Sequence, residues 1–248
     1  MQNMIKKLLF VCVFMGTFFT VFSDANNLKS ALNKADESFQ KKEYNKAYHL
    51  YDSLMKEEKV EDVIVWLRMS HLESMKGNTV ESMYYLNKIY KTTYHEAVWM
   101  QMENLSDKAE TDGVVLTDKE WVEQTYYNYQ VYILLFFASI TFLVFVFFIV
   151  HALRAEKVSL SRVVGLAVVL FILAAVNNLR LQSVDGIVHT EHVFMMKDAS
   201  AASGHVRELK AGDRIKVLGE KEVWAKVQIG DEEGYINKHT LKKVNPKS

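Results

Sequence analysis

Hydrophobic positions divide this sequence into an apolar middle and two polar ends. The apolar middle begins with residues 131–150, which carry no charged side chain. A helix of this length spans about 30 Å, the thickness of the hydrocarbon core of a bilayer. Aromatic residues, which are typical of a membrane interface, precede the run from Tyr126 onward. We therefore predict a transmembrane helix at 126–150; the alternative is a long buried core helix.

A second, weaker apolar run follows at 163–179, and we predict that it crosses the membrane again. Its strictly apolar part, 163–176, is short enough to suit a core, interfacial or re-entrant helix instead. The link at 151–162 carries three basic residues and one acidic residue, whereas the segment before the first run is acidic. The positive-inside rule therefore places the link in the cytoplasm and both polar flanks outside.

The first residues have the pattern of a secretory signal peptide, which we predict at 1–23. Two lysines precede the apolar stretch 8–22, and the small residues Ser23 and Ala25 follow it. An uncleaved membrane anchor is the alternative, and either one exports the segment that follows. The only cysteine, Cys12, lies within this stretch. A cleaved product therefore has no disulfide, no thiol nucleophile and no cysteine ligand for zinc.

The segment 28–112 combines helical periodicity with an internal repeat. The sequence at 42–47 corresponds to that at 77–82, an offset of 35 residues, and Ala47 and Ser82 are the small residues that match. This pattern resembles the tetratricopeptide repeat, which has a period near 34 and a small residue where two antiparallel helices approach. We predict helix pairs at 28–40 with 44–59 and at 62–75 with 79–91.

Two capping boxes mark further helix starts. Thr93-x-x-Glu96 predicts a helix that runs to about residue 112 and caps the repeats, and Thr117-x-x-Glu120 predicts a helix continuous with the first apolar run. The repeats lack the family's terminal proline, and Glu73 stands where the family prefers tyrosine. Two repeats are few for a continuous core, so a partner or the membrane surface is expected to complete it.

The tetratricopeptide resemblance implies a concave binding face. In that family, the first helix of each repeat lines this face. The alternative is that the apolar members are ordinary core residues, because apolar stripes on helices usually face a core. The positions that the resemblance assigns to the face are Leu32, Asp36, Phe39, Leu67 and His71.

The last segment, 187–244, changes to short strands. Residues 213–218 and 222–229 alternate apolar and polar side chains, and turn signals lie at 211–213, 219–220 and 230–231. About five strands of this length predict a small all-β barrel.

This segment resembles the bacterial SH3-like domain. The resemblance rests on Leu209-x-x-Gly212, Ile215-x-Val217, Trp224-x-x-Val227 and Gly234-Tyr235-Ile236, whereas the first strand, 193–198, departs from the family pattern. Such domains bind cell-wall peptides or protein segments, which implies a binding surface that includes Trp224 and Tyr235. The alternative is that both rings pack at the rim of the barrel.

Catalytic and metal sites are not indicated by the sequence. We find no phosphate-binding loop, dinucleotide fingerprint, nucleophile elbow or metalloprotease helix. The histidines at 189, 192, 205 and 239 lack the companions and spacing of a zinc site. The formal net charge is zero, so there is no global attraction to nucleic acid. We predict no enzyme, no cofactor and no metal; an unrecognised hydrolase stays as an alternative.

The predicted fold class is a multidomain membrane protein with tetratricopeptide-like helices, a two-helix transmembrane hairpin and a small SH3-like barrel. This order of parts resembles the BatE-type tetratricopeptide proteins of bacterial aerotolerance (Bat) operons. The resemblance implies a cytoplasmic-membrane protein with both soluble parts in the periplasm, working with Bat-type membrane partners. We predict a membrane-anchored adaptor that binds other proteins; the alternative is a sensor that binds peptidoglycan peptides through the SH3-like part.

Overall fold

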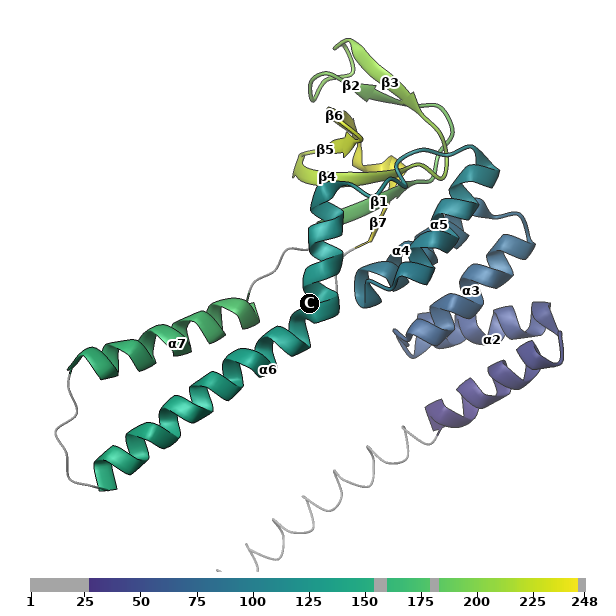
Figure 1. Ribbon diagram of the computed structural model, residues 1–248. Coiled ribbons are helices and arrows are strands. Elements are labelled where there is room, and N and C mark those ends of the chain that lie inside the picture. The colour runs from purple at the N-terminus through teal and green to yellow at the C-terminus, as the bar shows by residue number, and fades with distance from the viewer. Residues whose placement is uncertain (1–26, 154–159, 179–182, 245–248) are drawn as a thin grey trace, which may run out of the picture. The chain divides into compact units, whose positions relative to one another are not determined.

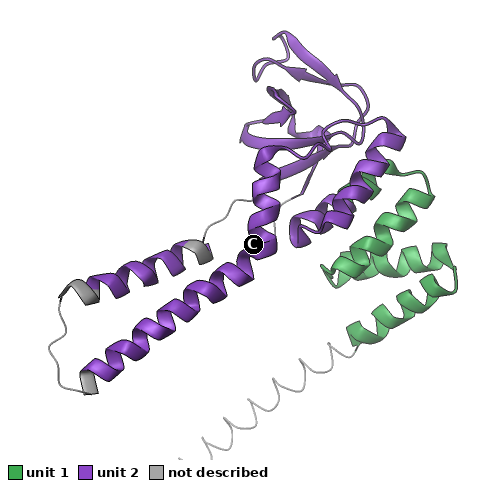
Figure 2. Ribbon diagram, in the orientation of Figure 1, with its two compact units in different colours: residues 1–85 green, residues 86–248 purple. Residues whose placement is uncertain are grey.

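The computed structural model describes residues 27–153, 160–178 and 183–244 (Figure 1). The predicted signal peptide, with Cys12, and residues 154–159 of the predicted cytoplasmic link lie outside the described residues. The chain divides into two compact units at residue 85 (Figure 2). We describe each unit separately.

The first unit consists of α-helices, in agreement with the helical periodicity of the sequence. A helix at 27–40 is followed by α2 (Tyr44–Glu57), α3 (Val63–Met75) and the start of α4 (Thr79–Thr93). Ala47 is fully buried, and this small side chain allows adjacent helices to approach closely. The core consists of Ala35, Ala47, Tyr51, Leu54, Val65, Met69 and Leu72.

Polar contacts define the ends of α3 in this unit. The Asp62 carboxylate caps its N-terminus by accepting from the backbone N–H of Ile64 at 2.7 Å. At the other end Glu73, the departure from the tetratricopeptide pattern, is buried and accepts from Asn78 Nδ2 at 2.7 Å. Ser70 and Ser82 join α3 to α4 with their hydroxyls 3.0 Å apart. Both serines are therefore satisfied although they are buried.

The second unit begins with the end of α4, followed by α5 (Glu96–Ala109). The predicted capping box at Thr93 is not formed. Thr93 is the last residue of α4, and its hydroxyl donates to the Ile89 carbonyl. Tyr94 then takes a positive φ of 49°, which ends the helix, and the His95 Nδ1 caps α5 by accepting from Ala97 N. Histidine is an uncommon cap, which is why the sequence pattern misplaced this helix start by two residues.

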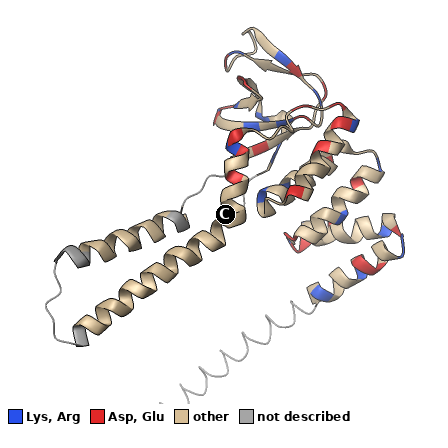
Figure 3. Cartoon of the chain, viewed as in Figure 1, with Lys and Arg blue, Asp and Glu red and all other residues tan. Residues whose placement is uncertain are grey.

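The capping box at Thr117 is formed, and it opens the longest helix, α6 (Asp118–Leu153). Thr117 N donates to Glu120 Oε2 at 3.2 Å, and Glu120 N donates to Thr117 Oγ1 at 3.4 Å. The helix continues without a break through the predicted transmembrane segment. Its charged residues are confined to its first two turns (Figure 3).

Among the described residues, α6 is the one helix long and apolar enough to cross a membrane. The next helix, α7 (Leu160–Asn178), packs along α6, and its apolar part at 164–175 is shorter (Figure 1). The structure therefore contains the predicted pair of apolar helices, and one of them meets the length criterion for a span.

The C-terminal part of the second unit is an antiparallel seven-stranded sheet with the order β3-β2-β6-β5-β4-β1-β7. Ten buried apolar residues, contributed by every strand, form one core on its inner face. The strands are β1 (Val184–Val188), β2 (Val193–Met196), β3 (His205–Leu209), β4 (Arg214–Lys221), β5 (Trp224–Ile229), β6 (Glu232–Asn237) and β7 (Leu241–Val244), with a 3-10 turn at Lys238–Thr240 before β7.

The strand prediction is wrong in four details. Gly219 does not form a turn, because it lies inside β4 at an irregularity in the pairing with β5. The chain turns instead at Glu222, which has a positive φ of 55°. Val223 therefore lies in the turn, 47% exposed, and does not share the buried face of Ala225 and Val227. The sheet also begins three residues earlier than predicted and has two strands more.

Candidate functional site

The outer face of the sheet, opposite its core, presents Trp224 and Tyr235. Along β5, Ala225, Val227 and Ile229 are buried, whereas Trp224 and the alternate positions are half-buried. Trp224 pairs with Asn237, and Lys226 pairs with Tyr235. Trp224 and Tyr235 are therefore diagonal neighbours on the same face, roughly 7–8 Å apart.

The same face continues onto β2, where the sequence analysis expected no site. Met196 pairs directly with Tyr235. Phe194 is 53% exposed and Met196 is half-buried, whereas Val193 and Met195 are buried in the core, so Phe194 and Met196 both face away from it despite an irregularity in the pairing with β3 between Met195 and Met196. We call Phe194, Met196, Tyr235 and Trp224 the outer row. The sequence carried no signal for it, because all four residues of β2 are apolar and their alternation between buried and accessible positions appears only in the structure.

Gly234 permits this arrangement, because β2 and β6 approach closely beside it. A Cβ at this position would lie 2.5 Å from the Met195 side chain and 2.7 Å from the Met196 carbonyl oxygen. Any larger residue would push β2 away from β6. The Gly234-Tyr235-Ile236 sequence thus places a glycine under the outer row and the tyrosine within it.

Charged side chains border the outer row. Lys226 pairs with Glu233 at 2.7 Å, which raises the pKa of the lysine above its ordinary value. The Lys226 side chain is 42% exposed and lies opposite Tyr235. His205 contacts the Phe194 ring edge to face, with the ring centres 5.9 Å apart. The row therefore combines aromatic rings with a cation, a surface that can stack on a peptide and hold a carboxylate.

In the helical unit, the structure brings together part of the predicted concave face. The rings of Phe39 and His71 lie 5.8 Å apart, and Tyr44 contacts both of them. The Arg68 guanidinium lies over the Phe39 ring at 4.3 Å. Three aromatic rings and one cation therefore form a surface cluster that includes exposed His71.

The other predicted members of that face have different surroundings. Asp36 accepts a hydrogen bond from the Tyr51 hydroxyl, so its carboxylate bonds within the unit. Leu32, Phe39 and Tyr44 are all partly buried and pack against the helical core. Leu67 is 43% exposed. The accessible parts of the predicted face are therefore Leu67, His71 and the exposed portions of the Phe39 and Tyr44 rings.

A buried charge cluster lies between the sheet and the helices of the second unit. Arg214 on β4 contacts Asp185 of β1 at 2.5 Å and Glu120 of α6 at 2.6 Å. Lys91 of α4 lies 3.4 Å from Asp185 and 3.3 Å from Glu123 of α6. All five side chains are 2% exposed or less. We call these five residues the charge cluster.

Neighbouring groups complete the surroundings of Arg214. Its Nε donates to the Asn87 side-chain oxygen at 3.3 Å, and its guanidinium lies 5.0 Å from the Trp99 ring centre. Lys216 reaches Glu120 from the margin of the cluster at 3.5 Å. Burial alone would raise the pKa of Glu120, but the Arg214 and Lys216 charges outweigh it and lower that pKa. Glu120 is therefore ionised at neutral pH.

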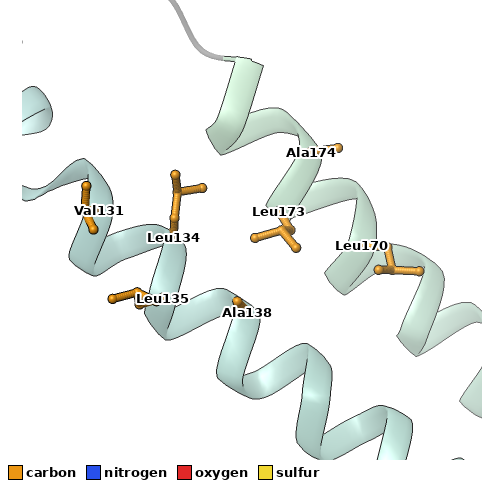
Figure 4. Close-up of a pocket in the computed structure, with 7 residues that line it drawn as sticks. All are labelled: Val131, Leu134, Leu135, Ala138, Leu170, Leu173 and Ala174. Atoms are coloured by element: carbon orange, nitrogen blue, oxygen red, sulfur yellow. The ribbon is translucent and has the colours of Figure 1, made fainter. Parts of the chain in front are cut away.

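An apolar groove lies elsewhere, between α6 and α7. It has a volume of about 510 Å³ (Figure 4). Its side chains are all apolar, so it offers no group for chemistry. They are Val131, Leu134, Leu135, Ala138, Leu170, Leu173 and Ala174. Among the described residues, no group of acidic, histidine or cysteine side chains is arranged to hold a metal ion.

Comparison with known proteins recognises a domain that includes Trp224 and Tyr235 of the outer row but not Phe194 and Met196. Residues 197–242 match the family model of the bacterial SH3 domain. No curated protein and no solved structure matches the chain. The domain is a peptidoglycan- or protein-binding module, which is consistent with an interaction role and suggests an extracytoplasmic location.

The family match supports the sequence prediction in part. The match includes β3 to β6, with Trp224 and Tyr235, but it begins at residue 197, after β1 and β2. Asp185 and Phe194 therefore lie outside the matched region. The comparisons carry no evidence for the tetratricopeptide or Bat resemblance, which stays an interpretation of the sequence.

Proposed function

We propose that this protein is a membrane-anchored adaptor that binds an extended protein segment through the outer row of its SH3-type sheet. The observation that carries the proposal is the continuous row itself. The row extends over the three adjacent strands β2, β6 and β5, and none of its side chains belongs to the buried core of the sheet. Its residues are Phe194, Met196, Tyr235 and Trp224. Aromatic side chains outside a core, beside a charged residue, are typical of surfaces that recognise partners.

The anchor in this proposal is a two-span hairpin with both soluble parts outside. Support comes from the charge cluster, because Glu120 precedes the apolar part of α6 and Arg214 follows α7. Two residues in contact lie on the same side of a membrane. If α6 crosses once, the chain must cross back before β1. At 1.5 Å per residue α7 is roughly 28 Å long, which suits a second span.

The partner in this proposal is another extracytoplasmic or membrane protein. A Bat-type complex is the partner class that the sequence resemblance implies. The aromatic cluster of the helical unit offers a second surface, and Phe39 with His71 would be its anchor residues. Two surfaces on one anchored chain raise the effective concentration of each toward a shared partner. The proposal assigns no catalytic step.

A photo-crosslinking amino acid at Tyr235 in the full chain tests the adaptor function. We expect a discrete crosslinked protein band from intact cells. The matched control is the same amino acid at Val223, which is also accessible but lies in the turn outside the row. Equal crosslinking from both positions, or none from Tyr235, would contradict recognition by the row.

Binding of a cell-wall peptide is a second candidate, favoured by Lys226 between the two aromatic rings. Carboxylates of such a peptide would be attracted to this cation. The test is co-sedimentation of the detergent-purified full chain with cell-wall sacculi. We expect Trp224→Ala to lose sedimentation and Val223→Ala to keep it. Failure of the wild-type chain to sediment would exclude this candidate and leave the adaptor.

A further inference from the structure

We propose that the charge cluster locks the SH3-type sheet to the outer end of α6, so that the sheet and the membrane helix move as one body. The outer row is then presented in one orientation to the bilayer and does not swing on a tether. This lock does not depend on which ligand the row binds.

The cluster draws its charges from three separate parts of the second unit. The helix α6 contributes two carboxylates, Glu120 and Glu123, and the two basic members come from α4 and β4. Asp185 on β1 contacts both basic residues. Each part therefore carries buried charge that the others neutralise. Movement of the sheet away from α6 would leave Glu120 without Arg214.

These polar contacts depend on the direction of each hydrogen bond, whereas apolar packing does not. Buried ion pairs contribute little net stability, because removing two charges from water offsets their attraction. Their geometry is restrictive, since the planar guanidinium of Arg214 presents donors in a fixed fork. That fork meets Asp185, Glu120 and the Gly113 carbonyl oxygen. Apolar surfaces of similar area would tolerate sliding, whereas this arrangement fits one relative position.

Backbone contacts reinforce the lock beside Arg214. The Arg214 N–H donates to the Asp112 carbonyl at 3.0 Å, and the Asp112 N–H donates to the Asp213 carboxylate at 2.8 Å. The connection between α5 and α6 is thus bonded to the start of β4. Lys216 adds a hydrogen bond to Thr117 at 3.0 Å, at the cap of α6. The contacts form a continuous path from sheet to helix.

The lock sets how far the sheet stands from the bilayer. From Glu120 to the start of the apolar run at Val131 is eleven residues, or roughly 17 Å of helix. If the proposed function is right, the partner of the outer row lies close to the membrane surface. A rigid connection also avoids the entropy loss of ordering a tether when the partner binds.

Distances between spin labels in the full chain test the lock. The labels replace Asn128 of α6 and Glu222 of the β4–β5 turn, both exposed, in a background with Cys12→Ser. We expect a single narrow distance distribution in lipid nanodiscs. The variant Glu120→Gln with Glu123→Gln should widen it, because the helix loses its charges while glutamine still fits the capping box. The matched control Asp118→Asn, on the same helix but exposed, should leave it narrow.

Each outcome decides the proposal. A broad distribution in the parent protein would show that the sheet is tethered and not locked. An unchanged width in the double variant would show that the charges do not hold it. If the double variant does not fold, as judged by circular dichroism, the single Lys216→Met change carries the test. It removes a marginal contact to Glu120 and should widen the distribution less. Crosslinking at Tyr235 is measured separately, so a failed lock and a failed binding function are distinguishable.

Discussion

Gly113 shows at single-residue scale how closely the helical connection approaches the sheet. Its φ is +89°, a conformation that favours glycine. A Cβ at this position would lie 1.7 Å from the Arg214 carbonyl oxygen. Because both partners are backbone, no side-chain rotation can relieve the clash. This glycine therefore permits the contact between residues 112–113 and β4.

Gly113→Ala should destabilise the second unit by about 3 kcal/mol, from backbone strain and steric overlap. Thermal unfolding of the full chain in detergent measures the effect. The matched control is Gly219→Ala, because a Cβ there meets nothing within 4 Å; its cost should stay within about 0.5 kcal/mol. Equal unfolding midpoints for the two variants would contradict the close approach.

Glu120 gives a prediction for pH. Its pKa in the folded protein lies below the ordinary value of 4.5. A carboxyl with a lowered folded pKa contributes stability that is present above its unfolded pKa and lost as pH falls through its folded pKa. The contribution of Glu120 to the stability of the second unit should therefore be level well above pH 4.5 and decline as pH falls below it.

Glu120→Gln isolates that contribution, because it cannot titrate. The variant should be less stable than the parent at neutral pH, and the difference should shrink as pH falls below 4.5. Chemical unfolding followed at several pH values measures both curves. Asp118→Asn serves as the control and should leave the parent's curve unchanged, since Asp118 is exposed. A constant difference between Glu120→Gln and the parent at all pH values would contradict the assignment.

At the scale of elements, β2 extends the binding face of the sheet. The family match covers β6 and β5, yet β2 supplies Phe194 and Met196 to the same row. The Phe194 side chain is more than half exposed, so burial in the core does not explain why a phenylalanine stands there. β2, which lies outside the matched region, therefore widens the surface for a partner.

Phe194→Ala should reduce the yield of crosslinking from Tyr235 while leaving the stability of the sheet nearly unchanged, because the side chain is 53% exposed. The expected change in stability is within about 0.5 kcal/mol. Leu218→Ala is the matched control, an exposed apolar side chain on β4 outside the row. Crosslink yield quantified from cells expressing each variant distinguishes them. An equal loss in both would point to a general effect on the sheet.

At the scale of the whole molecule, topology determines which compartment each surface faces. The charge cluster joins residues on both sides of the apolar helices, so a chain that crosses a membrane at α6 must return to the side from which it left. The basic link at 151–162 agrees with a cytoplasmic turn. Both observations favour an even number of crossings between Glu120 and Asp185.

Cysteine accessibility tests that topology in intact cells. Single cysteines at Glu103, Lys157 and Glu222, with Cys12→Ser, are treated with a reagent that does not cross membranes. We expect labelling at Glu103 and Glu222, and labelling at Lys157 only after permeabilisation. Labelling of Glu222 that needs permeabilisation would place the sheet in the cytoplasm and overturn both the anchor and the lock.

The local structure of this protein was determined largely by its sequence. Apolar periodicity located the helices at 44–57 and 63–75, and the Thr117 capping box located the start of α6. Alternation placed Trp224 and Tyr235 on the outer face. These features follow from interactions over a few residues, whose spacing is visible in the chain itself.

Tertiary structure decided which distant residues meet. Arg214 and Asn87 are 127 positions apart, and nothing in their surrounding sequence indicates that they bond. In the sequence, the carboxylates before the apolar run count only as a net charge for topology, whereas in the structure both Glu120 and Glu123 are buried, Glu120 beside Arg214 of the sheet and Glu123 beside Lys91 of α4. The Phe194 row likewise required the pairing of β2 with β6. No repeating pattern in the sequence marks which charges pair or which strands lie side by side. Only the fold therefore shows which of many possible contacts is made.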